Sequence, residues 1–301
     1  MEALRMGPRD CKRRMAAMSE SYVPVEGAEL YCREVGEGRP IIVIHGGPDF
    51  DHTCLLPDMD LLADSYRLIY YDQRGRGLSR GEVRLDDIGM DRYVEDLDQL
   101  RRHLGLDTAA ILGHSWGGLV AMHYALRHPG RVSHMILLNT ASASYDDFAL
   151  MREERSRMQG PHREKLDALS SSAAFEDGDP ETVAAYYRID FGTTFKRPED
   201  AARLDLTFTR EDILRGRAIE DRLAEGLFWQ PGFTIIPALR KLHTPTLVIH
   251  GENDFFPAAS SAHIAEAIPG ALLVTLANSG HFSYIDAADR VHRAIDDFIA
   301  G

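Results

Sequence analysis

The sequence predicts an α/β protein with a mostly parallel central sheet, flanked by helices and interrupted by a helical insertion. Short, almost uninterrupted apolar runs alternate with stretches in which apolar residues recur at helical spacing. This alternation is typical of parallel strands joined by crossover helices. The alternation stops near Ser142 and resumes near Pro245. With 301 residues, the chain is long enough for one such core together with an insertion.

The alternating elements begin after the first twenty residues. The predicted strands of the first half are apolar runs, at residues 29–35, 40–45, 67–71, 109–112 and 132–138. The predicted helices show helical apolar spacing, at residues 55–63, 90–104 and 118–128. The last of these helices ends before Pro129, because proline cannot continue a helix.

The second half contains the insertion and the return of the core. Residues 144–237 are polar and rich in helical patterns without a buried strand, so we expect a helical unit there. The core elements that follow alternate between strand and helix, at residues 245–250, 258–267, 271–276 and 287–299. The core therefore comprises residues 21–143 and 238–301. Residues 1–20 are locally basic and lack a long apolar run, so we expect a disordered tail there.

Composition and motif content exclude several classes of function. The net charge of −13 disfavours binding to nucleic acid or to anionic membrane surfaces, both of which attract cationic proteins. No apolar run reaches the length of about 18 residues that a membrane span needs. Three cysteines in so long a chain fit a reducing compartment, so we expect a cytoplasmic protein. No metal-binding or nucleotide-binding motif is present, so no cofactor or metal is expected; the oligomeric state stays open.

A glycine-rich turn directly follows the predicted strand at 109–112. From Gly113 to Gly118 it reads GHSWGG, which is the G-x-S-x-G pattern in the strand–turn–helix setting that the pattern requires. A serine at the tip of so sharp a turn needs glycine on both sides, since neighbouring Cβ atoms would clash. The turn exposes the hydroxyl at the edge of the sheet, so Ser115 is the predicted nucleophile.

The loop after the strand at 40–45 supplies a second element of a hydrolytic site. It reads His-Gly-Gly-Pro at residues 45–48, and glycine lets a backbone N–H approach a reacting carbonyl closely. We expect the N–H groups of Gly47 and Trp116 to form an oxyanion hole. Such a hole stabilises the developing negative charge by about 3–4 kcal/mol per donor.

Two further loops at the same edge of the predicted sheet carry an acid and a histidine. Asp254 and His281 each follow a predicted strand. The carboxyl ends of parallel strands meet at one edge, so His281 can reach Ser115 with the acid behind it. The order Ser, Asp, His along the chain is that of serine hydrolases built on such a sheet. We therefore expect a triad of Ser115, His281 and Asp254, with Glu252 as the weaker alternative acid.

Taken together, these motifs resemble the proline iminopeptidase branch of the α/β-hydrolases. The matching segments are His45 to Pro48 (HGGP), Tyr71 to Ser79 (YDQRGRGLS), Gly113 to Gly118 and Gly251 to Asp254. The resemblance covers roughly residues 28–143 and 240–300 and is weaker across the insertion. It implies the same catalytic residues and oxyanion donors, and it implies that the insertion forms a helical cap over the site.

The chain departs from that family at positions that bear on the substrate. Iminopeptidases hold the free amine of their substrate with acidic residues, largely from the cap. Here Phe255 follows the predicted catalytic aspartate and makes an apolar wall, and Asp190 is the nearest candidate acid in the insertion. Where the family usually has a glycine after Pro48, this chain has Asp49. This difference bears on the shape of the loop that carries Gly47, which we call the oxyanion loop (residues 46–50). The aromatic residues expected to line a substrate pocket are Phe50, Phe255 and Trp229.

The sequence therefore favours a serine hydrolase that cleaves small, apolar carboxylic esters through an acyl-enzyme intermediate, a carboxylesterase-like activity. The alternative is an aminopeptidase, such as a proline iminopeptidase, that releases an N-terminal residue from a short peptide. Two further alternatives use the same residues: a hydrolase-like receptor, and a cofactor-free lyase or perhydrolase. Epoxide hydrolases and dehalogenases are disfavoured, because they need a carboxylate at the position of Ser115.

Overall fold

A single eight-stranded sheet forms the centre of the protein in the computed structural model, which describes residues 18–227 and 230–301. The strands follow the order β1-β2-β4-β3-β5-β6-β7-β8 across the sheet. From β4 to β8 all neighbours are parallel, whereas β1 and β2 join antiparallel at one edge. The strand bounds are β1 Met18–Val25, β2 Ala28–Val35, β3 Arg39–Ile44, β4 Tyr66–Tyr71, β5 Ala109–His114, β6 Val132–Leu138, β7 Thr246–Gly251 and β8 Leu272–Leu276.

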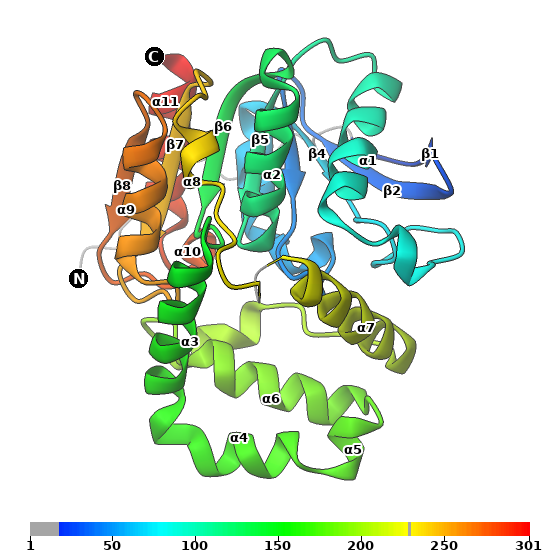
Figure 1. Ribbon diagram of the computed structural model, residues 1–301, viewed down its shortest axis with the longest axis vertical. Coiled ribbons are helices and arrows are strands. Elements are labelled where there is room, and N and C mark those ends of the chain that lie inside the picture. Colours follow the sequence, from blue (N-terminus) through cyan, green and yellow to red (C-terminus); the bar gives the residue numbers. More distant parts are fainter. Residues whose placement is uncertain (1–17, 228–229) are drawn as a thin grey trace, which may run out of the picture.

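Helices cover both faces of this sheet (Figure 1). Helices α1, α2, α8 and α9 contact one another side by side on one face, and α11 contacts β7 from the other. None of the helices in the described part of the chain is long and apolar enough to cross a bilayer. The helix bounds are α1 Met90–His103, α2 Trp116–Arg127, α3 Tyr145–Gln159, α4 Arg163–Ser170, α5 Ala173–Glu176, α6 Pro180–Gly192, α7 Arg210–Gly226, α8 Ile236–Leu239, α9 Ala258–Ala267, α10 Ser283–Asp286 and α11 Ala288–Ala300.

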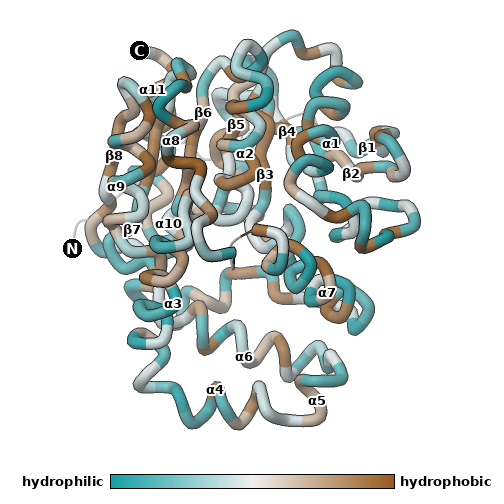
Figure 2. Tube along the Cα trace, viewed as in Figure 1, coloured by the Kyte–Doolittle hydropathy of each residue, from teal (hydrophilic) through white to brown (hydrophobic). Residues whose placement is uncertain are grey.

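The register of the parallel strands aligns the loops that carry the candidate site. Ile42 of β3 lies opposite Ile69 of β4 on one side and Ile111 of β5 on the other, and all three are fully buried. Figure 2 shows hydrophobic residues concentrated along these strands, as expected for strands covered on both faces. Because β3, β5, β7 and β8 run in one direction, the loops at their carboxyl ends meet at one edge of the sheet.

Helices α3 to α7 form a separate layer beyond that edge (Figure 1), and we call them the inserted helices. The chain leaves the core and returns to it at neighbouring points. Ser144 and Thr234 form an isolated antiparallel bridge, and the N–H of Ile235 donates to the carbonyl of Ala143 at 2.9 Å. The insertion is therefore attached to the core through two adjacent backbone segments.

Two elements differ from the sequence expectations. Residues 18–20, expected to belong to a disordered tail, pair with β2 as the start of β1, in which Val23 and Val25 are buried in period-two alternation. The rest of that expected tail lies outside the described residues. The predicted helix at 55–63 is replaced by two 3₁₀ helices, His52–Leu55 and Asp58–Asp64, that are separated at Pro57.

Candidate active site

Ser115 lies at the tip of the turn between β5 and α2, with a left-handed backbone (φ 54°). The close packing of this turn explains its glycines. A Cβ on Gly113 would lie 2.3 Å from the carbonyl oxygen of Gly117, and a Cβ on Gly117 would lie 2.3 Å from that of Ile44. A larger residue at Gly117 would push the turn away from β3, and one at Gly113 would clash with the backbone of the turn itself. A non-glycine residue in this region of φ is strained, and such strain is found at functional sites.

The structure brings Ser115, His281 and Asp254 into one hydrogen-bonded chain. His281 Nε2 lies 3.0 Å from Ser115 Oγ, and His281 Nδ1 lies 2.9 Å from Asp254 Oδ1. All three side chains are buried. Burial raises the pKa of the Asp254 carboxyl, but the adjacent His281 ring, His250 and the N–H of Phe256 together outweigh burial and lower it. An ionised Asp254 accepts a hydrogen bond from Nδ1–H, which leaves Nε2 unprotonated and able to take the serine proton.

Asn139, which directly follows β6, fixes the orientation of Asp254. Its Nδ2 donates to Asp254 Oδ2 and to the carbonyl oxygen of Gly280, both at 2.9 Å, and Asn139 itself has a left-handed φ of 45°. The N–H of Phe256 donates to Asp254 Oδ1 at 3.0 Å. The sequence analysis missed Asn139. A polar residue directly after a buried parallel strand was the signal that could have identified it.

Two other residues near the turn are placed outside this chain of hydrogen bonds. Glu252, the alternative acid, is exposed and accepts the N–H of Asn278 at 3.1 Å instead of facing His281. His114 is buried, and its Nε2 donates to the carbonyl oxygen of His281 at 3.0 Å. Burial lowers the pKa of His114 to about 3, so this ring stays neutral and holds the backbone of the histidine loop.

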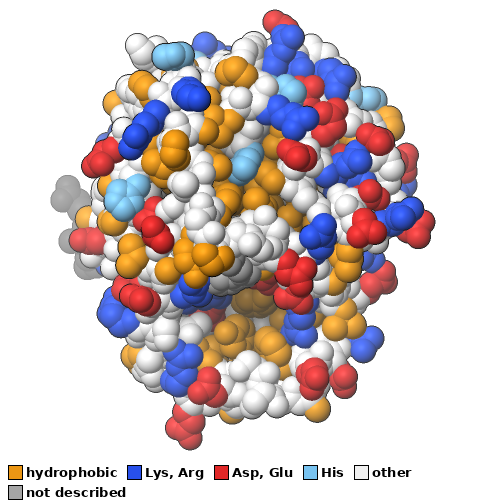
Figure 3. All heavy atoms as spheres, in the orientation of Figure 1, with side chains coloured by type: hydrophobic (Ala, Val, Ile, Leu, Met, Phe, Trp, Pro, Cys, Tyr) orange, Lys and Arg blue, Asp and Glu red, His pale blue; other side chains and the backbone are white. Residues whose placement is uncertain are grey.

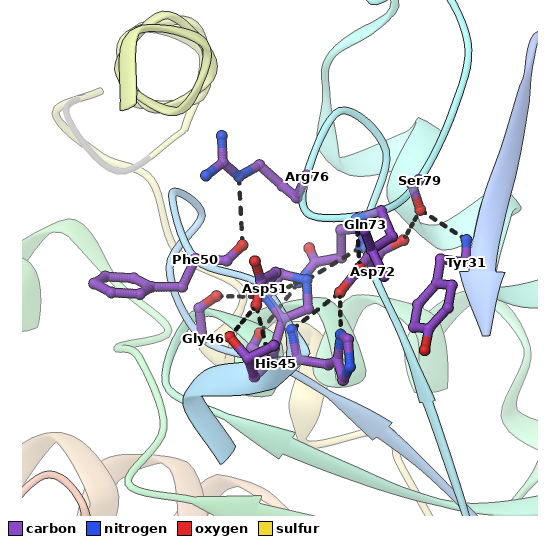
Figure 4. A network of polar contacts seen from close by, with 12 residues as sticks. Tyr31, His45, Gly46, Phe50, Asp51, Asp72, Gln73, Arg76 and Ser79 are labelled. Carbon is purple, nitrogen blue, oxygen red and sulfur yellow. Dashed lines mark hydrogen bonds and ion pairs between the residues drawn. The ribbon is translucent and has the colours of Figure 1, made fainter. Parts of the chain in front are cut away.

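The loop after β3 is fastened to the segment after β4 by buried polar contacts (Figure 4), and Gln73 extends these contacts to the start of α2. Gln73 connects them, because its N–H donates to His45 Nε2 at 3.1 Å while its Oε1 accepts the indole N–H of Trp116 at 2.8 Å. Asp72 accepts the backbone N–H of His52 at 3.0 Å and contacts His52 Nδ1 at 2.7 Å. The predicted oxyanion donors, Gly47 and Trp116, therefore belong to two segments that share one hydrogen-bond network.

A cavity of about 990 Å³, counted with its open mouth, adjoins Ser115 and lies between the core and the inserted helices. The face drawn in Figure 3 is hollowed beside these helices, with hydrophobic side chains inside the hollow. The Phe255 ring lies 4.1 Å from that of His281, centroid to centroid. Trp229, also predicted to line the pocket, lies outside the described residues. The cavity wall is rich in phenylalanine and includes Phe50, Phe148, Phe191, Phe255, Phe256 and Phe282.

Charged side chains also face this cavity, and the sequence analysis did not single them out as a group. Asp49 comes from the loop after β3, Arg155 from α3 and Glu220 from α7. Arg155 forms an ion pair with the buried Asp190, whose other oxygen accepts Gln159 Nε2 at 2.6 Å. Asp190, the nearest acid expected for amine binding, is therefore already occupied.

The carboxylates that remain at the cavity wall are Glu220 and Asp49, and Asp49 Oδ2 accepts the Tyr187 hydroxyl at 2.6 Å. Glu220 is an exposed residue of α7 that lines the cavity, and it has no hydrogen bond or ion pair within residues 18–227 and 230–301. Desolvation by the surrounding wall, followed by the charge of Asp49, raises the pKa of Glu220 to about 7. A carboxylate whose pKa is raised by a neighbouring carboxylate marks a place where a cation binds favourably. No pattern in the sequence of α7 distinguishes Glu220 from its solvated acidic neighbours.

Comparison with known proteins places this geometry in a family. A model of the alpha/beta hydrolase fold matches residues 39–288. The chain is 25% identical over 299 residues to a proline iminopeptidase of Clostridioides difficile, covering 94% of this chain and 98% of that protein. It is 27% identical to a proline iminopeptidase of Saccharolobus solfataricus, covering 94% and 92%.

Among solved structures, a proline iminopeptidase-related protein from Thermus thermophilus superposes with a TM-score of 0.71 at 24% identity, covering 94% of this chain and 98% of that one. At that identity the likeness shows the fold alone. The family match, in contrast, spans well over half of the chain. The resemblance seen in the sequence motifs is thereby confirmed. This protein belongs to the alpha/beta hydrolase fold family, and it is a hydrolase similar to proline iminopeptidases.

Proposed function

We propose that this hydrolase is a serine aminopeptidase that releases an N-terminal proline or another small apolar residue from short peptides. In this proposal Ser115 is the nucleophile, His281 the general base and acid, and Asp254 the residue that orients the imidazole. The inserted helices are the cap of the site. Support comes from the short contacts along these three side chains and from the likeness to proline iminopeptidases.

The chemistry follows from the order of these contacts. His281 Nε2 takes the Ser115 proton as Oγ attacks the scissile carbonyl, and the imidazolium then protonates the leaving amine. The backbone N–H groups of Gly47 and Trp116 stabilise the negative charge on the carbonyl oxygen. Water then hydrolyses the acyl-enzyme by the same steps, with His281 acting as base again.

The observation that carries the aminopeptidase assignment is the pair of carboxylates in a cavity whose wall is largely aromatic. The free amine of a peptide substrate is a cation, and moving it out of water is costly unless a carboxylate pairs with it. Glu220 has no hydrogen bond or ion pair among the described residues, although the charge of Arg155 reaches it, and Asp49 lies close enough to shift its pKa. We therefore assign Glu220, with Asp49, as the site of the substrate ammonium.

The aromatic wall favours the carboxylesterase-like activity as a second candidate. Phe50 and Phe255 line the cavity, and such a wall binds an apolar acyl group at about 25 cal/mol for each Å² buried. An esterase would not need an unpaired Glu220 beside Asp49. The charge of the cavity, more than its apolar area, thus separates the two activities.

The deciding experiment compares matched substrates with free and blocked amines. Prolyl-p-nitroanilide and its N-acetyl derivative present the same bond, so the difference in kcat/KM isolates recognition of the amine. We expect the acetylated substrate to react at least a hundredfold less efficiently. Equal or faster cleavage of the blocked substrate would overturn the aminopeptidase proposal in favour of the esterase. Ser115→Ala, measured alongside, shows that the turnover belongs to this site.

A further inference from the structure

We propose that Asp49 locks the oxyanion loop to the cap, so that the position of the cap sets the position of the Gly47 N–H. This inference rests on the proposed role of Gly47 as an oxyanion donor, but it does not depend on amine recognition. It makes Tyr187 and Arg76 positioning residues for the reaction. Three independent contacts support it.

The first contact is made by Arg76, a side chain that is only 2% exposed. Its Nη2 donates to the carbonyl oxygen of Asp49 and its Nη1 to that of Asp212 in α7, the latter at 2.9 Å. Its Nε lies 3.4 Å from the carbonyl oxygen of Phe50, also in the oxyanion loop (Figure 4). Within the described residues, no carboxylate forms an ion pair with Arg76. The Arg76 guanidinium therefore donates to backbone carbonyl oxygens, and these hydrogen bonds join the oxyanion loop to the cap helix α7.

The second contact is made by Tyr187 of α6. Its hydroxyl donates to Asp49 Oδ2 at 2.6 Å, which is the short distance of a charge-assisted hydrogen bond. The Tyr187 ring also packs on Phe50, with centroids 5.3 Å apart, and on Phe191, at 5.2 Å. A second cap helix is thus joined to the same two loop residues by a polar and an aromatic contact.

The third observation is how closely α7 approaches the loop. A Cβ on Gly216 of this helix would lie 2.9 Å from Arg76 Nη1 and 3.1 Å from Asp49 Cβ. Glycine at this position lets the helix backbone come into contact with both residues. A shift of α7 toward the core would therefore displace Asp49, and a shift away from the core would break the contact between α7 and Arg76.

The loop transmits such a movement to the oxyanion donor because it is tightly curled. Gly47 has a φ of 123°, and a Cβ there would lie 2.5 Å from the amide nitrogen of Asp49 and 2.8 Å from that of Phe50. A displacement of Asp49 must then rotate the peptide groups around Gly47. Donors of an oxyanion hole act only within a narrow range of distance, so a loosened loop lowers the rate of the chemical step.

The test uses Tyr187→Phe, which removes the hydroxyl that holds Asp49 and keeps the ring. The substrate is p-nitrophenyl acetate, which has no amine, and the transition-state analogue is phenylboronic acid, whose tetrahedral serine adduct fills the oxyanion hole. We expect kcat/KM for the ester to fall about tenfold, and the affinity for phenylboronic acid to weaken by a similar factor. Gly216→Ala, which inserts a methyl between Arg76 and Asp49, should give the same paired loss.

Tyr186→Phe is the matched control, because it also removes a tyrosine hydroxyl from α6. In the described part of the chain, the Tyr186 hydroxyl forms no hydrogen bond to residues 46–50. Thermal melting verifies that each variant is folded. If Tyr187→Phe leaves ester turnover and boronate affinity unchanged, or lowers turnover alone, the lock is refuted. A failure of the aminopeptidase proposal would leave this readout intact, since neither probe carries an amine.

Discussion

Replacing Glu220 by glutamine tests the amine site directly, because the substitution removes the charge and keeps the shape. An ammonium about 4 Å from a carboxylate gains roughly 4 kcal/mol at the effective dielectric constant of about 20 that suits protein surfaces. Glu220 is an exposed residue, so we discount this value to about 1.5–3 kcal/mol. The expected loss in kcat/KM for prolyl-p-nitroanilide is therefore about tenfold to a hundredfold.

The assay includes pH and a neutral substrate. Because the pKa of Glu220 is raised to about 7, its carboxylate is mostly protonated at pH 6 and ionised at pH 8, so cleavage of the amine substrate should improve across that interval. In Glu220→Gln this component of the pH profile should vanish, while p-nitrophenyl acetate is cleaved as in the wild type. The control is Glu225→Gln, an exposed acid on the same helix. An equal loss on both substrates, or no loss on either, would refute the assignment.

Further outcomes follow from the described contacts. Ser115→Ala should lower activity by about 10³-fold or more with an unchanged circular dichroism spectrum; a loss below tenfold contradicts its role as nucleophile. Arg74→Met should lower the free energy of unfolding, measured in urea, by about 3–5 kcal/mol, because it leaves the buried Asp96 without its ion pair. Burial lowers the pKa of His123 to about 4, so the unfolded chain binds more protons between that pH and about 6.5. The free energy of unfolding should therefore decrease as the pH is lowered from about 6.5 to 4, and His123→Leu should make this dependence on pH less steep.

The sequence was sufficient for the parts of the site that local geometry determines. Ser115, Asp254 and His281 each follow a buried parallel strand, and strands of one direction bring such residues to one edge. Glycine at Gly117 is required by the approach of β3, which the G-x-S-x-G pattern already encodes. These features depend on spacing within a few residues, so they can be recognised without a structure.

The groups that bear on the substrate depend on tertiary contacts that no local pattern records. Asp190 is excluded as the amine site only by its contacts with Arg155 and Gln159, which come from another helix. Glu220 and Asp49 are far apart in the chain, and they meet only because α7 packs on the oxyanion loop. The expectation of an apolar pocket rested on Phe255, and the wall is aromatic there. The charged side chains of the same cavity come from segments whose placement cannot be determined from sequence spacing.

The paired backbone at Ala143 and Ile235 has a consequence for how such enzymes diversify. Because departure and return are neighbours, the core needs no rearrangement to carry a different helical unit, and recombination at these two points could exchange one selectivity for another. A helical unit exchanged in this way must still satisfy one requirement of the core that receives it. The new unit must present a donor to the carboxylate of Asp49, or the transplanted enzyme will bind its new substrate and turn it over slowly.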